Sequence, residues 1–99
     1  MKRYRIEMAR AVSDLVRHLP PELKKKVKEA LKSIAADPHR SKELRDELAG
    51  LRSYRVARAR LIYRIEGSRI EVVAFGPRAD VYERAAAELC LALRKEKTD

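Results

Sequence analysis

Four arginines fall within twelve residues of this sequence, in the segment YRVARARLIYRI over residues 54–65; they are Arg55, Arg58, Arg60 and Arg64. Between them lie valine, leucine, isoleucine and tyrosine, which favour β-strands. No acidic residue occurs between Glu47 and Glu66, so the segment does not balance its own charge. Guanidinium groups present planar pairs of donors that suit phosphate oxygens. The segment therefore predicts strands with an anion-binding surface; a sheet edge protected from aggregation by charge is the alternative.

Side chains alternate between the two faces of a strand, so the pairing of this segment decides where the arginines point. We predict a hairpin of strands 53–57 and 60–66 with Arg58-Ala59 as its turn. One face then carries Arg55, Arg60 and Arg64, and it lies in a stretch that also contains Arg52 and Arg58. The other face carries apolar side chains suited to packing on helices, namely Tyr54, Val56, Leu61, Tyr63 and Ile65. We expect one apolar and one cationic face.

A second candidate site is the connection Gly76-Pro77-Arg78, with Tyr82 four residues after the arginine. Glycine permits an abrupt change of direction and proline stiffens it, so Arg78 would lie beside the start of a helix, where anions bind readily. The phenol of Tyr82 suits a phosphate, a stacked base or proton transfer. A structural role is equally compatible, with Asp80 as the helix cap, Tyr82 in the core and Arg78 in an ion pair.

Hydrophobic periodicity predicts the elements that position these residues. Pro20-Pro21 separates two helices, Gly67-Ser68 is a hairpin turn, and Asp80-Val-Tyr-Glu83 predicts the capping box of a last helix. The order β-α-α-β-β-β-α predicts an α+β fold, a mostly antiparallel four-stranded sheet with two N-terminal helices on one face and a C-terminal helix. The predicted elements are strand 3–8, helix 12–19, helix 21–36, helical turn 42–48, strands 53–57, 60–66 and 69–75, and helix 80–95.

Length and charge restrict the possible functions. The 99 residues suit one domain, residues 1–99, and 24 Lys+Arg against 15 Asp+Glu give a net charge of +9. Nucleic acid, an anionic membrane or an acidic protein are the partners that such a charge attracts. No apolar run approaches the roughly 20 residues of a spanning helix, and no signal peptide is evident. With Cys90 as the single cysteine, we expect a cytoplasmic protein without a disulfide framework or a metal site.

The two candidate sites occur in an order and spacing that resemble a known family. Tyr54-Arg-Val, then Arg60-Leu-Ile-Tyr63, then Gly76-x-Arg78-x-x-x-Tyr82 is similar to the RelE branch of the RelE/ParE toxin superfamily. The lysine-rich segment 23–31 and the Leu-Ala-Gly-Leu of residues 48–51 are similar too, so the resemblance covers nearly the whole chain. It implies a toxin of a type II toxin–antitoxin module that enters the ribosomal A site and cuts mRNA. The implied reaction is metal-independent attack of a ribose 2′-hydroxyl on the adjacent phosphate, without a cofactor.

The resemblance also implies roles for particular residues. Arg55 would contact the substrate phosphate or help to deprotonate the hydroxyl, and Arg60 would stabilise the charged transition state. Arg78 would bind the phosphate or the leaving group, and Tyr82 would stack on or orient the substrate. We expect further RNA contacts from basic residues around these four, and from the lysine-rich helix as a docking face for ribosomal RNA unless that is simply a solvated face: Arg52, Arg58, Arg64, Lys24, Lys25 and Lys28.

One departure from the family concerns the general base. The family has lysine on the second strand, but here the residue two positions beyond Arg55 is Ala57. Arginine stays protonated and is a poor base, and His18 and His39 lie outside the motif. Catalysis would then depend on positioned cations, or cleavage would have been lost.

Three functions follow from this comparison. The leading one is the ribosome-dependent mRNA endoribonuclease, with the ribosome, mRNA and a cognate acidic antitoxin as partners and with operator DNA reached through the antitoxin complex. The second is a ParE-like inhibitor of DNA gyrase, against which Tyr82 argues because that branch usually lacks this tyrosine. The third is a non-catalytic module that binds RNA or antitoxin.

Overall fold

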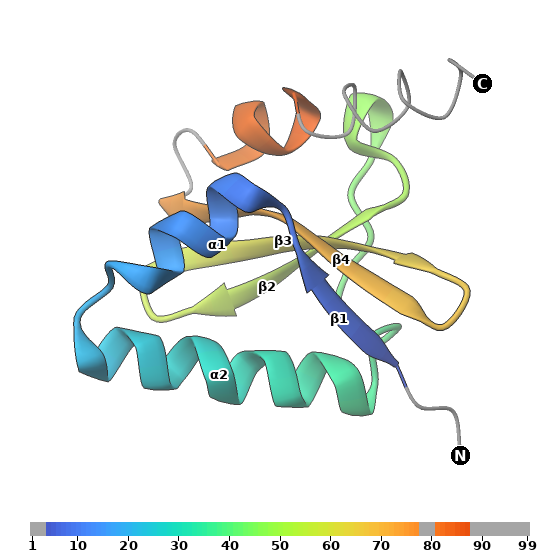
Figure 1. Ribbon diagram of the computed structural model, residues 1–99. Coiled ribbons are helices and arrows are strands. Elements are labelled where there is room, and N and C mark those ends of the chain that lie inside the picture. Colours follow the sequence, from blue (N-terminus) through green and yellow to red (C-terminus); the bar gives the residue numbers. More distant parts are fainter. Residues whose placement is uncertain (1–3, 78–80, 88–99) are drawn as a thin grey trace.

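The protein has the predicted order of elements. A computed structural model describes residues 4–77 and 81–87 (Figure 1). The chain also forms helix over residues 81–87, whereas the other residues of the predicted helix 80–95 lie outside the described part. The elements are β1 (Arg5–Met8), α1 (Arg10–Arg17), α2 (Pro21–Ala36), a 3₁₀ turn (Asp46–Leu48), β2 (Leu51–Val56), β3 (Ala59–Glu66) and β4 (Arg69–Pro77).

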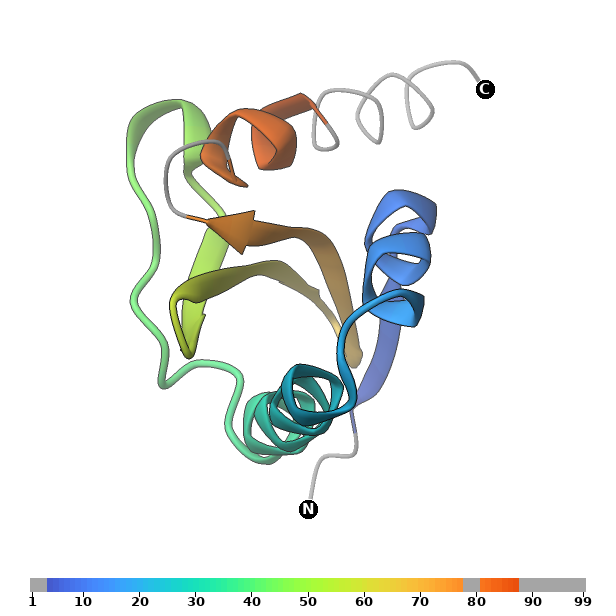
Figure 2. The same ribbon diagram turned by 90° about the vertical axis from the view of Figure 1, so that its left-hand side faces the viewer.

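The four strands form one sheet in the order β1-β4-β3-β2. The β2–β3 and β3–β4 pairs are antiparallel, and β1 joins β4 in parallel. Figure 2 shows the sheet between two layers, with α2 on one side and the 81–87 helix on the other. The α+β fold expected from the sequence is therefore confirmed.

Each face of the sheet has its own core. The face toward α1 and α2 buries Val56, Leu61, Tyr63 and their neighbours, and Tyr54 and Ile65 pack against that cluster, which is the apolar face expected from the alternation. The opposite face has an apolar centre as well, where Ile62 and Leu51 pack with Val81 and Ala85 of the 81–87 helix. The expectation of a wholly cationic second face is therefore wrong, because that face must bury the underside of a helix.

The hairpin turn lies one residue earlier than predicted. Arg55 pairs with Arg60 and Val56 with Ala59, so Ala57 and Arg58 form the turn. The pairing differs from the predicted one by two positions, and a shift of two preserves the side-chain faces. Arg55 and Arg60 therefore share a face, as expected.

The turn leaves Ala57 in a conformation that favours glycine, with φ of 54°. A non-glycine residue in the left-handed region destabilises the folded state by about 1 kcal/mol. Glycine avoids this strain but loses more conformational entropy on folding, which offsets part of the gain. We expect Ala57→Gly to raise the free energy of unfolding by about 0.5 kcal/mol, measured by urea denaturation. Ala59→Gly is the matched control: this position lies in β3 without a positive φ, so that variant should be destabilised by about 0.5–1 kcal/mol. An equal effect of the two variants would contradict the strain at Ala57.

A bulge in β4 changes which of its residues face the second core. Ile62 pairs with Ala74 and Tyr63 with Val72, so Val73 is the extra residue. Both Val73 and Ala74 pack in the second core, and Phe75 returns to the first. The bulge thus turns Gly76, opposite Arg60, toward the 81–87 helix.

Candidate functional site

A cavity of about 420 Å³ lies where the second face of the sheet meets the loop before β2 and the start of the 81–87 helix. Its walls combine cations, one carboxylate, a hydroxyl and a phenol from three separate parts of the chain. The residues that line it are Lys42, Glu43, Leu44, Arg45, Ser53, Arg60 and Tyr82. Two of the four predicted catalytic residues, Arg60 and Tyr82, therefore meet in one cavity.

Arg60 is the best-positioned cation of this cavity. It is half-buried on β3, and its Nη1 donates a hydrogen bond of 3.3 Å to Oγ of Ser53 on β2. Arg60 forms no ion pair with any described residue, so its charge remains available to a ligand. Ser53 is 9% exposed and is the one polar residue that the described part of the chain buries.

Arg55 lies opposite Arg60 in the strand pairing, but it does not line the Arg60 cavity. Its Nε donates to the carbonyl oxygen of Ala57 at 3.2 Å, and it lines two cavities of about 250 and 450 Å³ beside α2 and the loop before β2. Ser53 lines both the larger of these cavities and the Arg60 cavity. The two arginines therefore flank Ser53 along one continuous stretch of surface.

Glu43 is a carboxylate that the sequence patterns do not place at the site. It forms an isolated antiparallel bridge with Arg52 of β2, and its Oε1 lies 3.5 Å from Nη2 of that arginine. Its side chain is 55% exposed, so a ligand in the cavity can reach it. A carboxylate that sequence motifs do not identify therefore lines the Arg60 cavity, and a carboxylate is a group that can accept a proton.

The loop that carries Glu43 is fastened to the sheet by a buried tyrosine. The hydroxyl of Tyr63 donates to the carbonyl oxygen of Pro38 at 2.6 Å, and both residues are fully buried. Burial raises the pKa of Tyr63 above its ordinary value, so the hydroxyl keeps the proton that it donates. This hydrogen bond holds the start of the loop against β3, at the residue before Arg64.

Arg52 fastens the same loop further along. Its Nη1 donates to the carbonyl oxygens of His39, at 3.1 Å, and of Ser41, while Nη2 pairs with Glu43. Its side chain is 18% exposed. We interpret Arg52 as the residue that positions the loop, and its predicted RNA contact stays a prediction.

Arg64 lies at the far end of the second face, separated from Arg60 by Ile62. Its guanidinium forms ion pairs with Glu71 at 2.9 Å and with Glu66 at 3.3 Å. The hydrogen bond from Arg69 and then the charge of Arg64 hold the pKa of Glu66 below its ordinary value. The charge of Arg64 is thus balanced by carboxylates from outside the arginine segment, and the expectation of unopposed charge is wrong here.

The remaining predicted RNA contacts lie away from the cavity. Arg58 is exposed in the β2–β3 turn, and Lys25 and Lys28 are exposed on α2. Nζ of Lys24 donates to the carbonyl oxygen of Arg17 at 3.2 Å. Because α2 covers the opposite face of the sheet (Figure 2), these lysines would need a different part of a large partner. Arg78 lies outside the described residues.

The geometry suits phosphate chemistry on a polynucleotide. A cation held by Ser53 can stabilise a charged phosphate, a carboxylate can accept a proton, and a half-buried phenol at the rim can stack on a base or orient it. Among the described residues, no group of three His, Cys, Asp or Glu side chains is placed to hold a metal ion. None of the described helices is long and apolar enough to span a membrane.

Comparison with known proteins places this fold in a family. Residues 4–82 match the family model described as the ParE toxin of the type II toxin–antitoxin system parDE. Among solved structures, a chain of the toxin–antitoxin complex RelBE2 from Mycobacterium tuberculosis is 30% identical, with a TM-score of 0.69 and coverage of 77% of this chain and 99% of that one. No curated protein matches the sequence.

More distant structures share the fold. The Escherichia coli toxin RelE in the free state is 17% identical with a TM-score of 0.75, covering 88% of this chain and 98% of that one. The YoeB dimer from Staphylococcus aureus is 23% identical with a TM-score of 0.62, covering 71% and 91%. The chain belongs to the RelE/ParE toxin superfamily. Within it, this is a toxin of the type II toxin–antitoxin class.

Proposed function

We propose that this toxin is an endoribonuclease that cuts mRNA in the A site of the ribosome. The observation that carries the proposal is the Arg60 cavity, where a cation held by Ser53, the carboxylate of Glu43 and the phenol of Tyr82 surround one space. The net charge of +9 supports binding to an RNA-rich particle, since phosphate contacts dominate such affinity.

The proposed reaction is transfer of the phosphate within the RNA chain. The ribose 2′-oxygen attacks the adjacent phosphorus while Glu43 takes the hydroxyl proton. The bond from phosphorus to the 5′-oxygen breaks, which leaves a cyclic phosphate and a 5′-hydroxyl that takes up a proton. Arg60 stabilises the negative charge that builds on the phosphate. Arg55 contacts the RNA backbone beside this phosphate, and Tyr82 orients the base. Arg78 would bind the phosphate or the leaving group.

The proposed partners follow from the family. Solved relatives include complexes of RelE with RelB from Pyrococcus horikoshii and of YoeB with YefM from Staphylococcus aureus. We infer an acidic antitoxin that covers the arginines around the cavity, and operator DNA that is bound through the toxin–antitoxin complex. Such a toxin acts in the cytoplasm, where ribosomes and mRNA are found.

The test is primer extension on a defined message in a cell-free translation reaction with purified toxin. We expect cuts at codons in the A site and weaker cuts with Tyr82→Phe, which keeps the ring but removes the hydroxyl. Ribosomes without toxin provide the background pattern. Intact message together with unimpaired translation would overturn the proposal.

The match with the ParE family model favours a second candidate, inhibition of DNA gyrase. In that case the protein would act by binding the gyrase, and the cavity would not perform chemistry. Loss of gyrase supercoiling at toxin concentrations that leave every message intact would favour this candidate.

A further inference from the structure

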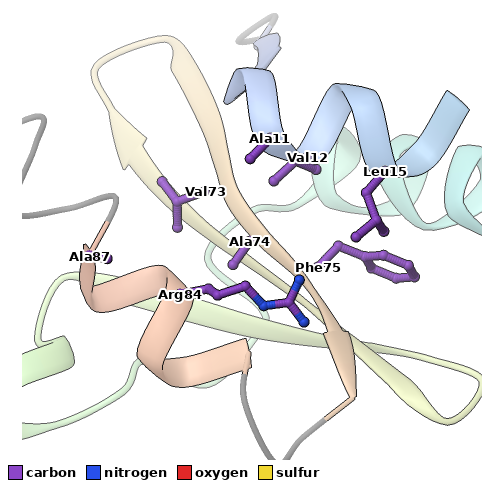
Figure 3. A pocket seen from close by; sticks show the side chains of 8 residues that line it. All are labelled: Ala11, Val12, Leu15, Val73, Ala74, Phe75, Arg84 and Ala87. Atoms are coloured by element: carbon purple, nitrogen blue, oxygen red, sulfur yellow. The ribbon is translucent and has the colours of Figure 1, made fainter.

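The cavities in the described part of the chain differ in the chemistry of their walls. The cavity between α1 and β4, of about 160 Å³, is lined mainly by alanine, valine, leucine and phenylalanine side chains (Figure 3). The cavity of about 450 Å³ beside the edge of β2 has polar walls instead, to which Ser33, Asp37, Arg40, Ser41 and Arg55 contribute. We call it the Arg40 cavity. Its size and its walls suit a polar ligand as large as a nucleotide.

Two cations of the Arg40 cavity are not engaged by carboxylates. Neither Arg40 nor Arg55 forms an ion pair with a described residue, and both residues are exposed. The hydrogen bond that Arg55 donates to the carbonyl oxygen of Ala57 uses Nε, which leaves its two Nη atoms for a ligand. Two guanidinium groups at one cavity favour an anion with several oxygens, such as a phosphate group.

The same cavity also offers an acceptor. Asp37 follows the last residue of α2, where the carbonyl end of a helix carries partial negative charge, and its carboxylate forms no ion pair with a described residue. This carboxylate would repel a free phosphate ion. A ligand that carries a hydrogen-bond donor beside its phosphate satisfies both the cations and the carboxylate. A nucleotide of RNA has this combination.

The turn after α2 determines how close the two groups of such a ligand must be. The backbone N–H of Arg40 donates to the carbonyl oxygen of Asp37 at 3.3 Å, so the cation and the carboxylate come from the two ends of one tight turn. The ribose 2′-hydroxyl lies beside the 3′-phosphate of the same nucleotide, whereas the hydrogen-bonding edge of the base lies farther away. The turn therefore favours the 2′-hydroxyl as the donor to Asp37, and this hydroxyl is common to every codon.

The Arg40 cavity adjoins the Arg60 cavity. Ser53 lines both, and Arg55 of the first faces Arg60 of the second in the β2–β3 pairing. Facing residues of antiparallel strands have Cα atoms about 4.5–5.5 Å apart. Phosphates bound by these two arginines are therefore close enough to belong to consecutive nucleotides.

We propose that the Arg40 cavity is a subsite for the nucleotide next to the one that is cut. Arg40 and Arg55 hold the 3′-phosphate of this nucleotide, and Asp37 accepts a hydrogen bond from its 2′-hydroxyl. The proposal rests on the ribonuclease function above, and it adds Arg40 and Asp37 to the residues that bind the message. Both act on the binding of RNA and not on the cleavage step.

Cleavage of messages with a single 2′-deoxy ribose on programmed ribosomes tests this subsite. The deoxy ribose is placed at one of the two nucleotides that flank the attacking one, so the attacking hydroxyl is retained. Single-turnover rates at subsaturating toxin are measured for the wild type, Arg40→Gln and Asp37→Ala. Exposed residues of α1 provide the matched controls, since Arg17→Gln removes an equal cation and Asp14→Ala an equal carboxylate. Melting temperatures show whether each variant is folded.

We expect Arg40→Gln to slow cleavage of the unmodified message about tenfold, the effect of losing one hydrogen bond to a charged group. At one flanking nucleotide, the 2′-deoxy ribose should slow the wild type and Asp14→Ala by a similar factor. The same deoxy ribose should leave the rate of Asp37→Ala unchanged, because the hydrogen bond that it removes is already absent.

The outcomes separate the subsite from the ribonuclease function. Equal rates for Arg40→Gln and Arg17→Gln would overturn the role of Arg40. A deoxy effect at both flanking nucleotides that is as large in Asp37→Ala as in the wild type, or absent from both proteins, would overturn the role of Asp37. In each of these cases the wild type still cuts. A wild type that cuts no message would refute the ribonuclease function, and the subsite with it.

Discussion

Replacing Arg60 by alanine should lower the single-turnover rate of mRNA cleavage on the ribosome about 10²–10³-fold, the usual loss when one preorganised group that stabilises transition-state charge is removed. Arg60 is held by Ser53 at the wall of the cavity and forms no ion pair with a described residue. Its charge is therefore unbalanced in the free protein and becomes useful when the phosphate gains charge. The measurement is quenched cleavage of message on programmed ribosomes with toxin in excess.

Two further variants make this result specific. Arg17→Ala removes an equal charge from the exposed end of α1 and should cut at the wild-type rate. Ser53→Ala removes the hydroxyl that accepts the hydrogen bond and should give a smaller loss than Arg60→Ala, because the cation remains. If Arg60→Ala cut as fast as Arg17→Ala, the cavity would not be the site of cleavage.

Glu43→Gln should lower the same rate about 10²–10⁴-fold, the range that a positioned general base contributes. Glutamine keeps the size and the polar contacts of the side chain but does not accept the hydroxyl proton. Binding of the toxin to ribosomes should change little, since the cations of the surface remain. The loss should therefore appear in the cleavage step, measured with saturating toxin.

The ion pair between Glu43 and Arg52 needs its own control. Arg52→Gln breaks the same pair but leaves the carboxylate in place. If Glu43 acts as the base, its variant should lose far more activity than the Arg52 variant. Equal losses would mean that Glu43 acts only by positioning the loop, and a fully active Glu43→Gln would remove it from the mechanism.

Most of the fold could be predicted because it depends on local patterns. Alternation with a period of two identifies β2 and β3 and puts Arg55 and Arg60 on one face, although it places the turn one residue late. Ala57 explains that error, because its positive φ in the turn is not signalled by its residue type. The same alternation does not indicate the bulge at Val73, which brings two consecutive side chains, Val73 and Ala74, into the core beneath the 81–87 helix.

The candidate site was only partly predictable because one of its residues, Glu43, depends on contacts between distant segments. Glu43 reaches the cavity because the loop pairs with Arg52 and because Tyr63 holds Pro38. Neither contact is indicated by a periodic pattern in the sequence.

The parallel pairing of β1 with β4 has a consequence for the timing of toxicity. Arg5 pairs with Arg69. During synthesis β1 is therefore made first but cannot pair until β4 has also been made. Pairings between such distant residues form slowly. The Arg60 cavity also forms only after late residues have been made, because its walls combine residues 42–45 with Tyr82. A nascent chain that still lacks Tyr82 thus has no assembled Arg60 cavity.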